Sequence, residues 1–208
     1  MPIHLNEIDI VSELEGLDSA LIVACNMCAG ASFAMNENKP FIQFFTNLLK
    51  SPPLERYIGK LKCQLSEKGV KARKFKGGII QQFFLCLWTS RQRKKLRNYA
   101  KEYEAVIVLG CDSAIETVRD SVKGTDCYVI KGMEVAGIMN TKPRFHLPCN
   151  ISFQESKVIP ICDQHCRPLR QKSFRKKEKT LLTNMTLTDK KNSCVYNRRD
   201  GSSYILKK

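Results

Sequence analysis

The sequence predicts an α/β domain, a small three-layer structure in which helices cover both faces of a parallel sheet of about four strands. Continuous apolar runs at residues 20–25 and 105–110 are typical of strands that a parallel sheet buries on both faces. Segments with helical spacing separate the runs, and this alternation implies right-handed crossovers in a parallel sheet. A chain of 208 residues is long enough for one such domain and an appendage.

The first half of the chain supplies the first strands and one clear helix. Residues 20–25 form a strand that ends in a turn of small residues, 25–32. Residues 54–69 have apolar positions at helical spacing and end at Gly69, which suits a helix C-terminus. Residues 70–75 alternate apolar and basic side chains, which predicts an edge strand, and residues 79–88 are apolar enough for a strand or a buried segment.

The second half continues the alternation. We expect a basic surface helix over residues 90–103, a strand over 105–110 and a helix over 114–122, capped by Asp112 or Ser113. A short strand follows at residues 127–130. Three prolines then predict an irregular closing segment, and they are Pro143, Pro148 and Pro160.

The composition divides the chain into a domain, residues 1–166, and a basic tail, residues 167–208. The whole chain is 43% hydrophobic and 26% charged, as in an average soluble protein. Of the formal net charge of +15, the tail holds +10. Because the tail has few apolar residues and no lasting periodicity, we expect it to be flexible.

The N-terminal half indicates a cytoplasmic protein that does not enter a membrane. The first Lys or Arg is Lys39, so the sequence lacks the positive segment of a secretory signal. The uncharged stretch 19–36 is interrupted by Asn26 and small residues, and it suits a buried strand and loop better than a membrane span. The ten cysteines are then reduced, and clustered reduced cysteines bind metals or perform redox chemistry.

Several cysteines follow the predicted strands at their carboxyl ends, which share one edge of a parallel sheet. Cys25 and Cys28 end one strand, Cys111 ends another, and Cys86 lies near the end of the apolar segment 79–88. These four are our first choice of ligands for zinc or an iron–sulfur cluster, with Cys149 as a substitute for any of them. The alternative is that they are small buried apolar residues.

A second candidate metal group lies at Cys162, His165 and Cys166. Zinc would accept the two thiolates together with His165 or the earlier His146. The paired element of a zinc finger is missing, so an ordinary surface turn is the alternative. The remaining cysteines receive no functional role, and they are Cys63, Cys127 and Cys194.

These motifs resemble the C-terminal-type cysteine-rich domain associated with methylenetetrahydrofolate reductase, a partner unit of acetogenic and related anaerobic microbes. The segments YEAVIVLGCDSAIETVRD, CYVIKGMEVAGIM and RFHLPCN carry the resemblance, which spans residues 20–166. Cys25 and Cys28 match its early C-x2-C motif, and Cys111 matches its later strand-end cysteine. The resemblance implies a zinc or iron–sulfur subunit that works beside a flavin-dependent reductase on reduced folates.

The leading hypothesis is therefore a metal- or iron–sulfur-binding accessory or electron-transfer subunit. Neither His146 nor His165 has a partner at triad-like placement. The chain also lacks the common phosphate-binding motifs GxxxxGK[ST] and GxGxxG. The sequence thus gives no sign of catalytic machinery of its own.

Two hypotheses from other classes remain. The basic tail and residues 91–97, with five basic side chains, indicate nucleic-acid binding beside a structural zinc site, although few aromatic residues are interleaved. Alternatively, Cys25 and Cys28 form a C-x-x-C thiol redox pair. Such pairs precede a helix, and residues 29–40 make a weak helix start.

Overall fold

The computed structural model describes residues 3–14, 16–43, 50–78, 82–146 and 150–161, together with two short strands further on. The chain divides into two compact units, Met1–Gln164 and His165–Lys208. In the second unit, β9 (Cys194–Tyr196) pairs antiparallel with β10 (Ser203–Ile205). The rest of the predicted basic tail lies outside the described residues.

The first unit contains a four-stranded parallel sheet with the strand order β4-β2-β5-β6. All three neighbouring pairs in it are parallel. The strands are β2 (Ser19–Ala24), β4 (Lys71–Lys74), β5 (Ala105–Leu109) and β6 (Tyr128–Lys131). The predicted α/β class with a parallel sheet of four strands is confirmed, and β4 is an edge strand as expected.

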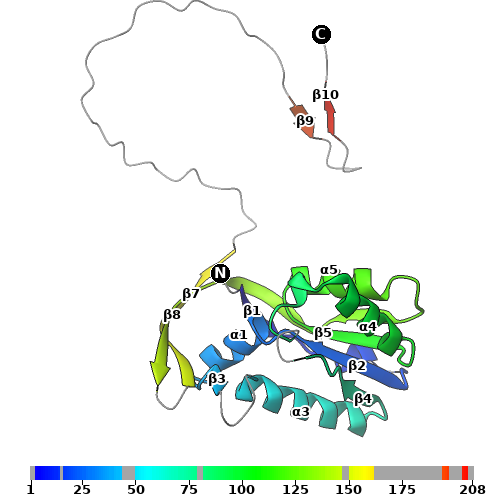
Figure 1. Cartoon of the computed structure of the whole chain (residues 1–208), viewed down its shortest axis with the longest axis horizontal. Coiled ribbons are helices and arrows are strands. Elements are labelled where there is room, and N and C mark those ends of the chain that lie inside the picture. The colour runs from blue at the N-terminus through cyan, green and yellow to red at the C-terminus, as the bar shows by residue number, and fades with distance from the viewer. Residues whose placement is uncertain are drawn as a thin grey trace, which may run out of the picture. The chain divides into compact units, whose positions relative to one another are not determined.

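Four helices accompany this sheet: α1 (Cys28–Asn36), α3 (Pro52–Glu67), α4 (Ser90–Ala100) and α5 (Asp112–Val122). Helix α1 packs against α3, and α4 packs against α5. In Figure 1 the pair α4 and α5 is drawn on one side of the strands and the pair α1 and α3 on the other. The chain turns one way in the sheet from β2 to β4 and the other way from β5 to β6.

The reversal of direction makes a topological switch point between β2 and β5, which is where open α/β sheets bind ligands. The two strands pair in register from Ala20 with Ala105 to Ala24 with Leu109. Just beyond, the backbone N–H of Cys25 donates to the carbonyl oxygen of Leu109 at 2.8 Å. The residues that follow each strand therefore start from adjacent positions.

Burial explains why β5 is the centre of the sheet. Each of its residues is fully buried, as are Ala20 and Ile22 of β2. Helix α5 covers β5 with an apolar stripe at helical spacing, and its buried apolar members are Ala114, Ile115, Val118 and Val122. A single core cluster joins the strands to these helices.

Helix α1 differs from the turn of small residues predicted for 25–32. Most of α1 is buried, so its sequence shows no polar face and no helical alternation. Gly30 is needed at the contact with the start of α3, because a Cβ there would come within 2.9 Å of the Cβ of Ser51. The uncharged stretch 19–36 thus forms β2 and α1. Among the described residues, no helix has the length and apolarity to cross a bilayer.

A second, antiparallel sheet with the strand order β1-β7-β8-β3 replaces the predicted irregular closing segment. Its strands are β1 (Ile3–Glu7), β3 (Ile42–Gln43), β7 (Met133–His146) and β8 (Asn150–Pro160). Pro143 lies within β7 because β1 pairs only with residues 133–138 of that strand. The missing N–H of Pro143 then faces no second partner strand, and Pro160 is the last residue of β8.

Core packing at β5 predicts the effect of a truncation there. Ile107 is 0% exposed at the middle of the strand, so Ile107→Ala should lower the free energy of unfolding by about 2–5 kcal/mol. Ile159→Ala in β8, where the side chain is 53% exposed, is the matched control and should change it by about 0.5 kcal/mol or less. Denaturant unfolding measures both, and equal effects would contradict the burial pattern.

Candidate functional site

Three of the predicted cysteines meet at the switch point between β2 and β5. Cys25 directly follows β2, and Cys28 is the first residue of α1. Cys111 follows β5 after Gly110 and is the N-cap residue of α5. Residues far apart in the sequence are therefore brought to the carboxyl edge of the parallel sheet, as the order of the strands dictates.

The thiol of Cys28 links the other two. Its side chain hydrogen-bonds to those of Cys111 and Cys25, and both interactions raise the pKa of Cys28 far above its ordinary value. Cys28 thus keeps its proton. The ionisation of Cys25 and Cys111 is coupled to that of Cys28.

Cys25 is 3% exposed and lies next to the start of α1. Its hydrogen bond with Cys28 lowers the pKa of Cys25 to about 7 against the opposing effect of burial, and backbone contacts from Leu85, Cys28 and Met27 assist. In its protonated form the thiol also reaches the carbonyl oxygen of Phe83 at 3.3 Å. Backbone N–H groups at a helix start favour the thiolate.

Cys111 is 5% exposed, and its pKa is lowered to about 6. The hydrogen bond with Cys28 is the main cause, burial opposes it, and the backbone of Ala114 and Ser113 lowers the pKa further. The expected caps, Asp112 and Ser113, are wrong, since both lie inside α5. The sulfur makes no regular cap hydrogen bond, but the start of the helix still favours its thiolate.

Gly110 allows the two cysteine-bearing segments to lie this close. A Cβ at residue 110 would come within 2.9 Å of the Cβ of Ala114 and 3.3 Å of the Cβ of Cys25. Any larger residue would push α5 or the loop after β2 away. The separation of Cys25 from Cys111 therefore depends on a glycine at this position.

Cys86 lies beside this group without joining it. It belongs to the short 3-10 helix η3 (Leu85–Leu87). For residues 79–88 we expected a strand or a buried segment, and the described part, residues 82–88, contains no strand and is only partly buried. The side chain is exposed, and its pKa is raised first by desolvation and then by the charges of Cys25 and Cys111. Among the described residues the structure records no hydrogen bond from Cys86 to the three thiols.

The other predicted ligands cannot be placed beside this group. Cys149, Cys162, His165 and Cys166 lie outside the described residues. His146, the alternative ligand, is exposed at the end of β7, where its Nε2 hydrogen-bonds to Ser152 Oγ at 2.8 Å. Cys63 is exposed on α3.

The donor chemistry of the three thiols suits a soft metal. Thiolates favour zinc and iron–sulfur centres, and two of these three ionise readily. Asn26, between Cys25 and Cys28, has a buried Oδ1 for which the described residues supply no hydrogen-bond partner. Within the part of the chain that the structure describes, however, no three His, Cys, Asp or Glu side chains form a group that could hold a metal ion. Cys28 affects the ionisation of both of its neighbours, but the three thiols as placed do not make a metal site.

Sequence reasoning missed the contribution of β1. The backbone of Ile3 contacts the thiol of Cys28 and lowers its pKa slightly, against the larger effects of the neighbouring thiols. On the same strand, His4 is buried, and its Nδ1 finds no hydrogen-bond partner among the residues that the structure describes. No signal in residues 3–7 indicates this placement, because it depends on the pairing of β1 with β7.

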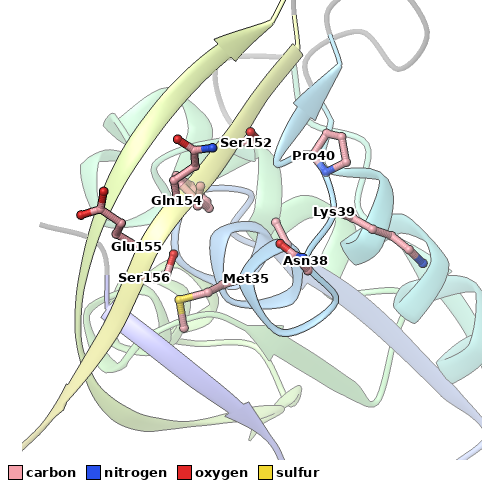
Figure 2. A pocket seen from close by; sticks show the side chains of 10 residues that line it. Met35, Asn38, Lys39, Pro40, Ser152, Gln154, Glu155 and Ser156 are labelled. Atoms are coloured by element: carbon pink, nitrogen blue, oxygen red, sulfur yellow. The ribbon is translucent and has the colours of Figure 1, made fainter.

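A separate hollow of about 600 Å³ lies between the C-terminal end of α1 and β8. Figure 2 shows Met35 and Asn38 from the α1 side and Gln154 and Ser156 from β8 around it. Its lining is mainly polar, and none of the described predicted ligands contributes to it. It is therefore distinct from the thiol group.

No family model, curated protein or solved structure matches this chain. The functional argument therefore depends on the thiol group itself.

The central position of Cys28 predicts how its removal changes the other thiols. In metal-free protein, Cys28→Ala removes the main cause of the lowered pKa values, so those of Cys25 and Cys111 should rise toward the ordinary 9.0. Titration of the thiolate absorbance in the ultraviolet measures this. Cys63→Ala, at an exposed position, is the control and should leave the titration of the other thiols unchanged.

The same shift has a consequence for stability. A lowered folded-state pKa contributes stability that is fully present above 9.0 and is lost as the pH falls through about 6 for Cys111. Cys28→Ala should therefore flatten the dependence of the unfolding free energy on pH in this window. An unchanged pH dependence of the unfolding free energy would contradict the role of Cys28 in lowering the pKa values of Cys25 and Cys111.

Proposed function

We propose that this chain is a metal- or iron–sulfur-binding accessory or electron-transfer protein, whose centre is held by Cys25, Cys28 and Cys111. One feature supports the proposal: thiols that follow two strand ends lie at the switch point of a parallel sheet, close enough for Cys28 to shift the pKa values of Cys25 and Cys111. Buried cysteines that serve only as small apolar residues do not require lowered pKa values. Here Cys25 and Cys111 combine burial with lowered values.

The surroundings of the sulfurs suit a charged centre. A bound iron–sulfur cluster would supply one-electron transfer, and zinc would supply a structural link between the two strand ends. The chain itself excludes water by burying Cys25 and Cys111 and provides backbone contacts to their sulfurs from Leu85, Ser113 and Ala114. Burial and such contacts are the features by which proteins tune a reduction potential.

A tetrahedral site needs a fourth ligand, for which we propose Cys86 with Cys149 as the substitute. Cys86 is close enough for the charges of Cys25 and Cys111 to affect its pKa, and it belongs to a three-residue 3-10 helix. A rotation of this short element is a smaller change than the movement of a strand. On metal binding, Cys86 would then supply the fourth ligand beside the three inner thiols. The three-layer arrangement, with helix pairs on both faces, would keep the two strand ends fixed during this change.

The partner belongs to the same proposal. The resemblance to the cysteine-rich domain associated with methylenetetrahydrofolate reductase suggests that the centre serves a flavin-dependent reductase of one-carbon metabolism. The group Cys162, His165 and Cys166 would then be a second metal site, of zinc or iron–sulfur type.

A thiol redox protein is the second candidate, because Cys25 and Cys28 hydrogen-bond to each other and α1 does begin at Cys28. The helix that a C-x-x-C pair requires is therefore present. The burial of Cys25 counts against it, since an attacking thiolate must reach its substrate. The third thiol, Cys111, is also left without a role in this reading.

Metal analysis of protein purified without oxygen tests the proposal. The wild type should contain close to stoichiometric zinc, or iron with acid-labile sulfide and a broad visible absorption band. Cys111→Ala should lose most of this content because it removes one sulfur from the centre. Cys111→Ser keeps the size of the side chain and should lose it too, whereas Cys63→Ala should not.

A folded wild type without zinc, iron or sulfide would overturn the proposal. If oxidation of that protein then joined Cys25 to Cys28 in a reversible disulfide, the thiol redox reading would replace it. Equal metal content in the wild type and in both Cys111 variants would place the metal elsewhere in the chain.

A further inference from the structure

A basic groove of about 850 Å³ lies along the open edge of the parallel sheet, where β4 is the outermost strand. Its walls come from β4 and the residues after it, from α3, and from α4 and the residues after it. Glu102 is its single acidic lining residue. Five cationic side chains line it, namely Lys50, Lys62, Arg73, Lys74 and Lys76.

Ion pairs within the part of the chain that the structure describes neutralise little of this positive charge. Lys74 is paired with Glu55 of α3. For the other four cations, no ion pair occurs among the described residues. Lys95 of α4 adds a further charge beside the groove, because its Nζ donates to the carbonyl oxygen of Lys76 at 3.2 Å. Uncompensated cations on concave walls concentrate positive potential and attract anions.

An aromatic side chain stands beside these charges. Tyr99 lines the groove and is 39% exposed. The buried ring of Phe75 packs against Tyr99 in an edge-to-face contact, with ring centroids 5.4 Å apart and ring planes at 88°. Because alternate residues of a strand share a face, Arg73 extends on the same side of β4 as Phe75. A guanidinium and a partly exposed ring are thus presented together.

The strand itself adds neutral donors. The N–H groups of Lys71 and Phe75 point inward to the carbonyl oxygens of Asp18 and Ile22. In a parallel pair the intervening residues turn their N–H groups the other way, so those of Ala72 and Lys74 point toward the open edge. Backbone N–H groups beside Arg and Lys are the donors that phosphate oxygens commonly receive.

We propose that the β4-edge groove binds a nucleotide, with its phosphate on Arg73 and Lys76 and its base against the ring of Tyr99. Phosphate explains the uncompensated cations, and a planar base explains the exposed ring beside them. A free nucleotide and one unit of a single-stranded nucleic acid share this chemistry. An acidic peptide would use the cations but not the ring.

This inference does not depend on the thiol centre, although the two sites share a boundary. Gln82 lines the groove, and its Nε2 donates to the carbonyl oxygen of Gly77 at 3.1 Å. The backbone oxygen of Gln82 accepts from the N–H of Asn26, between Cys25 and Cys28, at 2.6 Å. Loss of the metal would leave the cations and the ring of the groove in place.

The test is a binding titration with the full chain and two probes, a short fluorescent single-stranded oligonucleotide and a free mononucleotide. Tyr99→Leu keeps an apolar contact with Phe75 but removes the ring, and it should weaken binding by roughly 5- to 150-fold. Tyr99→Phe keeps the ring and should bind like the wild type. Arg73→Glu should weaken binding of both probes and reduce the salt dependence for the oligonucleotide by roughly 0.7 in slope per lost phosphate contact.

Lys123→Glu is the matched control for charge. It makes the same charge change at an exposed position directly after α5, near the opposite edge strand β6. It therefore corrects for general attraction to the basic tail, which all variants retain. Circular dichroism and thermal unfolding verify that each variant is folded.

The outcomes separate the sources of the ligand and the competing explanations. Binding of both probes, or of the mononucleotide alone, with loss in Tyr99→Leu and Arg73→Glu, assigns the groove to a free nucleotide. Binding of the oligonucleotide alone with the same losses assigns it to a single strand. No binding of either probe overturns the proposal. Equal weakening by Lys123→Glu and Arg73→Glu, or full binding by Tyr99→Leu, also overturns it, because charge alone would then explain the affinity.

Discussion

The parallel pairing of β2 with β5 is the constraint on which the rest of the structure depends. It runs in register to Ala24 and Leu109, so the two chains leave the sheet side by side. The chain winds away from this pair in opposite directions, which makes the carboxyl edge between them a topological switch point. Gly110 then keeps Cys25 close to the start of α5. The meeting of the thiols is a consequence of the strand order.

Burial and hydrogen bonding act in opposite directions on these thiols. Burial alone would raise every pKa in the group, as it does for the unconnected Cys127, whose value is raised to about 11. Cys28 reverses this effect for its two neighbours, because it is the main cause of their lowered pKa values. The site thus contains ionisable sulfur in an apolar setting, which is the condition under which a cation binds most favourably.

The sequence predicts the parallel sheet because strands that are buried on both faces consist of continuous apolar runs, as β2 and β5 do. The gathering of Cys25, Cys28 and Cys111 was predictable for the same reason, since strand ends of a parallel sheet share an edge. Helix α1 was not, because its small residues are buried on most sides and show no periodicity. The sheet formed by β1, β7 and β8 was not predicted either, because it depends on pairing between the two ends of the unit. Its strands also contain prolines, which are typical of irregular segments. The exposure of Cys86 follows from a 3-10 turn that an apolar segment does not indicate.

X-ray absorption at the edge of the bound metal tests the central claim most directly. If the three thiols hold one centre, the spectrum of the anaerobically purified wild type shows a sulfur shell at roughly 2.3 Å. That shell should lose amplitude when Cys25, Cys28 or Cys111 is replaced one at a time. A first shell made only of nitrogen and oxygen, or a sulfur shell that survives all three replacements, would contradict the account.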